Sequence, residues 1–155
     1  MRRNDREITD FSEIVGIIDR CDCCRLGLLD RNEAYIVPMN FGYDTDNDRL
    51  TLYFHSAADG RKIELIARPS TVSFEMDTNH ELVRGTIGCA FSFRYQCVMG
   101  TGSIAVLTDP NEKRFGMGKI MEHYTGKSLW NFRDDMLDKT AVLKLSVDSL
   151  SCKAY

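Results

Sequence analysis

The residues best suited to chemistry stand together in residues 54–62, where strand-like sequence leads into a polar loop and two cations. Ser56 offers a hydroxyl, and Arg61 and Lys62 stand at the expected start of a helix. Free backbone N–H groups and the helix dipole favour an anion there. Arginine can grip phosphate oxygens with two donors, and lysine adds a point charge. The segment therefore indicates a phosphate-monoester site, although an ordinary helix start with two solvated cations has the same pattern.

Other motifs in the chain do not hold up as sites. Residues 100–105 match the Gly-x-Gly-x-x-Ala dinucleotide fingerprint, but strand-like sequence follows where that fingerprint needs a helix. Residues 44–48 begin like a calcium loop that lacks the required glycine and final glutamate. His80 and His123 have no partner at metal-ligand spacing, so no metal site is expected.

The cysteines indicate a reducing compartment rather than a disulfide framework. The N-terminal residues are too polar for a secretion signal, so free thiols and a cytoplasmic location are expected. Cys21 and Cys24 form one Cys-x-x-Cys pair without the second pair that structural zinc needs. The six cysteines are Cys21, Cys23, Cys24, Cys89, Cys97 and Cys152.

Capping motifs locate the helices that must hold these residues in place. Asp10 and Glu13 form a capping box before apolar residues at helical spacing, and 109–112 repeat that form with proline at the first helical position. Pro69 is expected to stop a short helix before it. The sequence predicts helices at 11–20, 60–67 and 110–124, and a helical turn within 129–137.

Strand-like runs fill most of the remaining chain. The first three should form an antiparallel meander, with Pro38 at an edge, a bulge or an unbonded position, because proline cannot donate to a sheet. About six strands and few helices predict a mostly β fold, an antiparallel barrel with helices at its ends, as one domain over 1–155. The runs are 25–29, 34–43, 49–55, 71–76, a long β-rich stretch made of 89–93 and 95–107, and 141–147.

Composition excludes several classes of protein. The 155 residues are 43% hydrophobic and 28% charged, with a formal net charge of −3. These values fit a soluble globular domain. The mild acidity argues against a nucleic-acid binder, and no apolar run is long enough to span a membrane.

Four stretches carry a combination of motifs that is more specific than any one of them. His-Ser-Ala-x-x-Gly-Arg-Lys at 55–62 follows a strand, soon after Tyr-Ile-Val-Pro-Met-Asn-Phe-Gly-Tyr at 35–43. With this combination, the chain resembles the pyridoxamine 5′-phosphate oxidase-like flavin-binding split barrels, especially the nitroimidazole-resistance (Nim) subgroup. The resemblance covers most of the chain and weakens after residue 129. The matching stretches are 1–10, 25–43, 52–75 and 112–126.

The resemblance implies a six-stranded antiparallel split β-barrel that forms a homodimer with FMN at the subunit interface. By position, Ser56, Arg61 and Lys62 would hold the FMN phosphate, and residues 95–97 would approach from the second subunit. His55 would lie beside the phosphate or the ribityl chain. The isoalloxazine would be lined, largely through backbone groups, by Val37, Pro38, Met39 and Asn40.

The resemblance also implies an activity. The protein would be an FMN-dependent oxidoreductase that passes reducing equivalents from NAD(P)H to a small oxidised acceptor, a nitroaromatic in the Nim-like proteins. The flavin would carry the chemistry. His55 is the candidate proton donor, with a phosphate-shell hydrogen bond as its simpler role. The alternatives are a flavin-binding protein without turnover, and a haem-binding or haem-degrading relative with His55, His80 or His123 as axial ligand.

Overall fold

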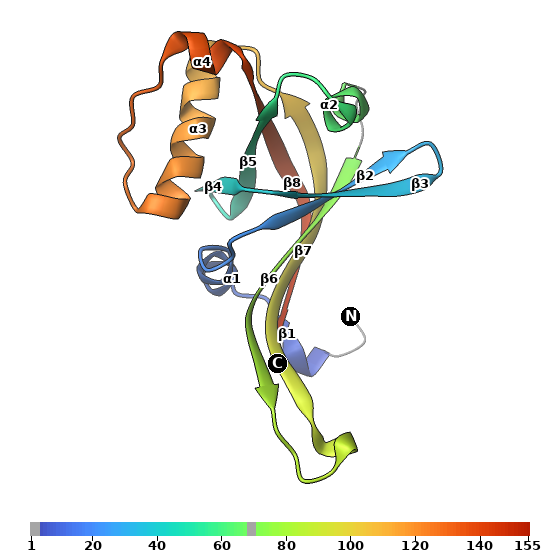
Figure 1. Ribbon diagram of the computed structural model, residues 1–155. Helices are drawn as coiled ribbons and strands as arrows, with labels where there is room; N and C mark the ends of the chain where they lie inside the picture. The colour runs from blue at the N-terminus through green and yellow to red at the C-terminus, as the bar shows by residue number, and fades with distance from the viewer. Residues whose placement is uncertain (1–3, 68–70) are drawn as a thin grey trace.

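Eight antiparallel strands and four α-helices make up the computed structural model, which describes residues 4–67 and 71–155 (Figure 1). The helices are α1 (Phe11–Ile18), α2 (Arg61–Ile66), α3 (Pro110–Thr125) and α4 (Asp134–Asp138), with 3₁₀ turns at Asn4–Arg6 and Gly88–Ala90. The strands are β1 (Glu7–Ile8), β2 (Cys24–Asp30), β3 (Glu33–Met39), β4 (Phe41–Asp46), β5 (Arg49–Ala57), β6 (Thr71–Val83), β7 (Ser92–Val106) and β8 (Thr140–Ala154).

The strand order gives the sheet its curvature. The order is β3-β2-β6-β7-β8-β5-β4, so β3 and β4 lie at opposite edges although only Asn40 separates them in the chain. A single residue can join both edges only if the sheet curls until they meet. The result is the expected mostly β, antiparallel split barrel, left open because β3 and β4 do not pair within the described residues.

The expected count of six strands is wrong, and so is the strand assigned to Cys89. The run 34–43 is two strands, because the chain leaves one sheet edge at Asn40 and joins the other. Strand β1, which pairs with the end of β8, was not expected. Cys89 lies in a 3₁₀ turn at the tip of the β6–β7 hairpin. Pro38 lies on β3 opposite Arg25, at the edge position that proline tolerates.

The expected caps are confirmed at both longer helices. The Asp10 side chain accepts a hydrogen bond from the Glu13 backbone N–H at 2.9 Å, and α1 then ends two residues earlier than predicted. Asp109 accepts from two backbone N–H groups at the start of α3, and Gly126 ends that helix in the left-handed conformation. Pro69, expected to stop α2, lies outside the described residues.

One continuous apolar cluster fills the barrel interior. Helix α1 contributes Ile14, Ile17 and Ile18 from one face, and α2, which lies well apart from it in Figure 1, contributes Ile66. Burial of these stripes, rather than intrinsic propensity, stabilises such short helices. The largest fully buried side chains of the cluster are Phe41, Phe54 and Phe74.

Helix α3 packs against β4 and β5 outside this cluster through two glycines. A Cβ on Gly42 would lie 2.3 Å from the Lys119 carbonyl carbon, so strand and helix backbones approach closer than any side chain allows. A Cβ on Gly116 would lie 2.9 Å from the Tyr53 ring and 3.0 Å from Val142. The two glycines therefore let α3 approach the sheet more closely than residues with side chains would allow.

The β6–β7 hairpin extends far beyond the barrel (Figure 1). Its distal half exposes large apolar side chains, including Leu82, Ile87 and Phe93. The sequence predicted only the first part of β6, because a two-stranded ribbon exposed to solvent on both faces shows no hydrophobic alternation. No helix in the described ranges is long and apolar enough to cross a membrane.

The close approach of α3 predicts that Gly42→Ala destabilises the fold by about 2–3 kcal/mol, since the methyl group meets helix backbone that cannot rotate away. Gly118→Ala on the same helix is the matched control. Its Cβ would meet nothing within 4 Å, so it should stabilise the protein by about 0.5–1 kcal/mol. Urea denaturation measures both, and a Gly42→Ala protein as stable as wild type contradicts the packing argument.

Candidate functional site

Pairing between β4 and β5 brings two separate parts of the predicted site together. Phe41 lies opposite Phe54 in the ladder. Extending this register by one residue places Asn40 beside His55, where the chain leaves the end of β3. The sequence-predicted segments 37–40 and 55–56 therefore come together at Asn40 and His55, although fourteen residues separate these two in the chain.

Alternation along β5 separates His55 from Ser56. Phe54 is buried in the barrel interior, His55 is exposed, and Ser56 is partly buried. Because successive side chains of a strand point to opposite faces, His55 and Ser56 do not share a face. The Lys62 Nζ donates to Ser56 Oγ at 3.0 Å, which joins the end of β5 to the first turn of α2.

The two cations of α2 have different surroundings. No carboxylate among the described residues lies within ion-pair distance of Lys62, whose ammonium keeps donors beyond the one given to Ser56. Arg61 instead donates from Nε to Asp30 Oδ2 at 2.7 Å and from Nη2 to Asp30 Oδ1. Its Nη1 donates to Glu64 at 2.9 Å. An incoming anion could thus accept hydrogen bonds from Lys62 directly, but would compete with Asp30 and Glu64 for the donors of Arg61.

These ion pairs keep both partners charged. The hydrogen bond from Arg61 lowers the pKa of the Asp30 carboxyl below its ordinary value. The bonds to Asp30 and Glu64 raise the pKa of the Arg61 guanidinium. Of the two cations at the start of α2, Arg61 pairs with both carboxylates and Lys62 pairs with neither.

The segment 37–40 can meet a ligand mainly through its backbone. Met39 is buried, and Val37 packs against the main cluster. Pro38 and Asn40 are exposed. Because β3 is an edge strand, one side of its backbone has no neighbouring strand and can accept or donate hydrogen bonds.

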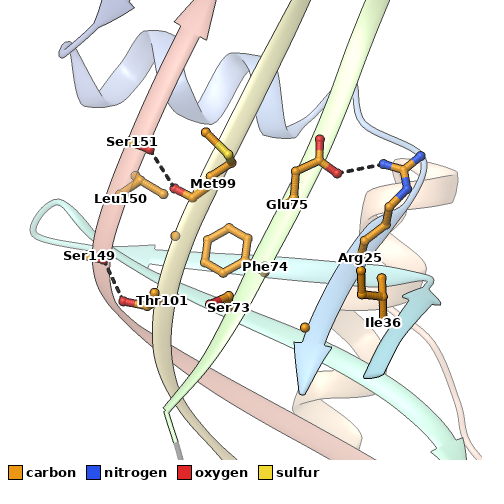
Figure 2. A pocket seen from close by; sticks show the side chains of 12 residues that line it. Arg25, Ile36, Ser73, Phe74, Glu75, Met99, Thr101, Ser149, Leu150 and Ser151 are labelled. Carbon is orange, nitrogen blue, oxygen red and sulfur yellow. Dashed lines mark hydrogen bonds and ion pairs between the residues drawn. The ribbon is translucent and has the colours of Figure 1, made fainter. Parts of the chain in front are cut away.

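A groove of about 810 Å³ lies across β3, β2, β6, β7 and β8 (Figure 2). Ile36 and Met99 give it apolar walls, and the Arg25–Glu75 ion pair, at 2.9 Å, lies along one side. None of the predicted site residues lines it. Its sequence signal is small or polar residues at alternate positions, such as Ser149 and Ser151, which a solvated face also shows.

Two of the three histidines have other partners. The ring of His123 packs beside Phe41, with Nε2 2.8 Å from the Cys21 carbonyl oxygen and a buried Nδ1 without a partner. His123 thus links α3, on which it lies, to the segment after α1, which is a structural position. His80 pairs with Asp77 at 2.9 Å. The His55 side chain is exposed and makes no hydrogen bond to the described residues.

The cysteines form no disulfide, and four of the six are buried. Burial raises the pKa of the Cys21 and Cys97 thiols to about 12, and that of Cys152 to about 11. Neutral thiols are poor nucleophiles. No group of three or more metal-ligating side chains occurs among residues 4–67 and 71–155.

Comparison with known proteins identifies a family and several similar solved structures. The family model described as pyridoxamine 5′-phosphate oxidase matches residues 10–154. A solved structure from Bacteroides thetaiotaomicron VPI-5482, provisionally identified as a 5-nitroimidazole antibiotic resistance protein, is 35% identical. That match covers 96% of this chain and 86% of the other, with a TM-score of 0.82. No curated protein matches the sequence.

More distant structures share the fold. The flavocytochrome Anf3 from Azotobacter vinelandii matches with a TM-score of 0.84 at 18% identity, over 100% of this chain and 72% of that one. An FAD- and haem-binding protein from Mycobacterium smegmatis has the same score and identity, over 96% and 73%. At this identity, the likeness extends to the fold alone.

Proposed function

The chain belongs to the pyridoxamine 5′-phosphate oxidase family, and on that premise we propose that it is an FMN-dependent oxidoreductase. It would take reducing equivalents from NAD(P)H and pass them to a small oxidised acceptor, of the nitroaromatic class. The 35% identical resistance protein supports this acceptor class. The observation that carries the proposal is the junction of Ser56, Lys62 and Arg61 at the end of β5, where the extended β4–β5 register also puts Asn40 beside His55.

The residues at this junction fit a phosphate monoester. Lys62 would supply an uncompensated positive charge, Ser56 a hydroxyl, and Arg61 those donors that its carboxylates leave free. The exposed backbone of Val37–Asn40 would lie along the ring system. FMN, when bound, would supply the hydride and electron chemistry. His55, on the other face of β5, is the side chain that we propose as proton donor to the acceptor.

Two further parts of the proposal concern assembly and location. A homodimer with FMN at its interface is supported by the apolar face around the groove, where Ile36 is 65% exposed and Leu29 71%. Monomeric proteins rarely leave such a patch uncovered. The free thiols support a cytoplasmic location. We also propose that residues 1–155 act as one FMN-binding domain.

The phosphate site predicts that a double variant, Arg61→Ala with Lys62→Ala, loses FMN during purification while its thermal unfolding stays cooperative. Removing two exposed cations elsewhere, by Arg49→Ala with Arg133→Ala, gives a control with the same change in net charge. Fluorescence titration of each apoprotein with FMN measures the difference. Equal FMN affinity in the double variant and the control contradicts the assignment.

The oxidoreductase proposal predicts a flavin absorption band that bleaches on addition of NADH or NADPH and returns when a nitroaromatic is added. His55→Gln should keep the flavin and slow the return of the band, because it removes the proposed proton donor. A band that never bleaches favours a flavin carrier. A Soret band in the purified protein favours the haem-binding alternative.

The proposed dimer predicts that Ile36→Asp converts the protein from twice the chain mass to the monomer mass and weakens FMN retention. A charge at this position would have to be desolvated in the interface. Leu129→Asp, at a residue 92% exposed on the connection between α3 and α4, is the control and should remain dimeric. Light scattering after gel filtration measures the masses, and an Ile36→Asp dimer argues against this interface.

A further inference from the structure

The Arg61 side chain is held by a carboxylate from a distant part of the sequence. Asp30 ends β2 and lies opposite Glu33 across the two-residue turn between β2 and β3, so the tight hairpin fixes its position. From there it accepts the Nε and Nη2 donors of Arg61 side by side. This is the two-donor geometry that a phosphate would use.

The second carboxylate near Arg61 is less well placed. Glu64 accepts a single hydrogen bond from Nη1, and its side chain is 65% exposed against 23% for Asp30. Water screens an exposed charge more strongly than a partly covered one. Asp30 is therefore the stronger competitor for the Arg61 guanidinium.

Competition at Arg61 matters because the proposed ligand group carries the same sign of charge as Asp30. A phosphate monoester has a charge of about −1.5 to −2 at neutral pH. It would approach one cation, Lys62, that has no carboxylate partner in the described chain, and another, Arg61, that already binds two carboxylates. A ligand without the phosphate, such as riboflavin, makes no demand on Arg61 and is indifferent to Asp30.

We infer that Asp30 is a specificity-determining residue which competes with the FMN phosphate for Arg61 and so limits selectivity for FMN over riboflavin. This inference rests on the proposed phosphate site. Lys62, which has no carboxylate partner in the described chain, then provides the basal attraction for the phosphate. Asp30 then determines how much Arg61 contributes to phosphate binding beyond the contribution of Lys62.

The test is Asp30→Asn, in which the amide oxygen can still accept one hydrogen bond from Arg61 but the negative charge is gone. We expect FMN to bind about fivefold more tightly to this variant, with riboflavin affinity unchanged. Glu64→Gln makes the same change in net charge and should alter FMN affinity less than about twofold. Fluorescence titrations of the apoproteins, repeated at high salt, measure all three.

Two checks keep the result interpretable. Asp30→Ser removes the same charge with a different side chain and should shift FMN affinity in the same direction. Inorganic phosphate alone should raise the melting temperature of Asp30→Asn more than that of wild type, without any flavin.

Distinct outcomes overturn the two proposals. Wild type that prefers FMN over riboflavin, with no tighter FMN binding in Asp30→Asn or Asp30→Ser, overturns only the role of Asp30. An equal effect of Glu64→Gln also overturns it, since net charge alone would explain the change. Wild type that binds FMN no better than riboflavin, or binds neither, overturns the phosphate site and this inference with it.

Discussion

The passage of the chain through Asn40, from one edge of the sheet to the other, is the constraint on which the rest of the structure depends. With β3 and β4 at opposite edges and one residue between them, the sheet can only curl. The curl encloses the apolar cluster that stabilises both short helices, α1 and α2. It also leaves one side of the β3 backbone unpaired. The cofactor site that we propose would use this free strand backbone, which results from how the barrel begins to close.

Helix α3 packs on the outside of the sheet and holds the chain in place just after Asn40. Its backbone lies against Gly42, two residues after Asn40. Near the C-terminal end of the helix, the Tyr124 hydroxyl accepts from the Phe41 backbone N–H at 3.2 Å and donates to the Asp22 carbonyl at 2.8 Å. Helix α3 therefore fixes the start of β4 at two successive residues. Such support from neighbouring elements is what an oriented binding site requires.

The charges at the start of α2 are arranged so that the two adjacent cations differ in availability. Among the described residues, the Lys62 ammonium hydrogen-bonds only to a hydroxyl. The Arg61 guanidinium instead donates to a carboxylate next to the β2–β3 turn. Two neighbouring basic residues in the sequence are thus unequal in the fold. The difference arises because the turn that holds Asp30 reaches the helix start, which no local pattern encodes.

The sequence by itself determined the starts of α1 and α3, the mostly β class and the candidate residues for the phosphate site that we propose. Capping, period and motif are local properties, as at Asp10, Asp109 and 55–62. Only the tertiary structure decided that the run 34–43 divides at Asn40 and that β6 and β7 continue as a wet ribbon. It alone brought Asp30 to Arg61 and opened the groove beside Ile36. These features depend on pairing between segments far apart in the chain. The free energy of such pairing depends on both segments together, so no hydrophobic pattern within one segment predicts it.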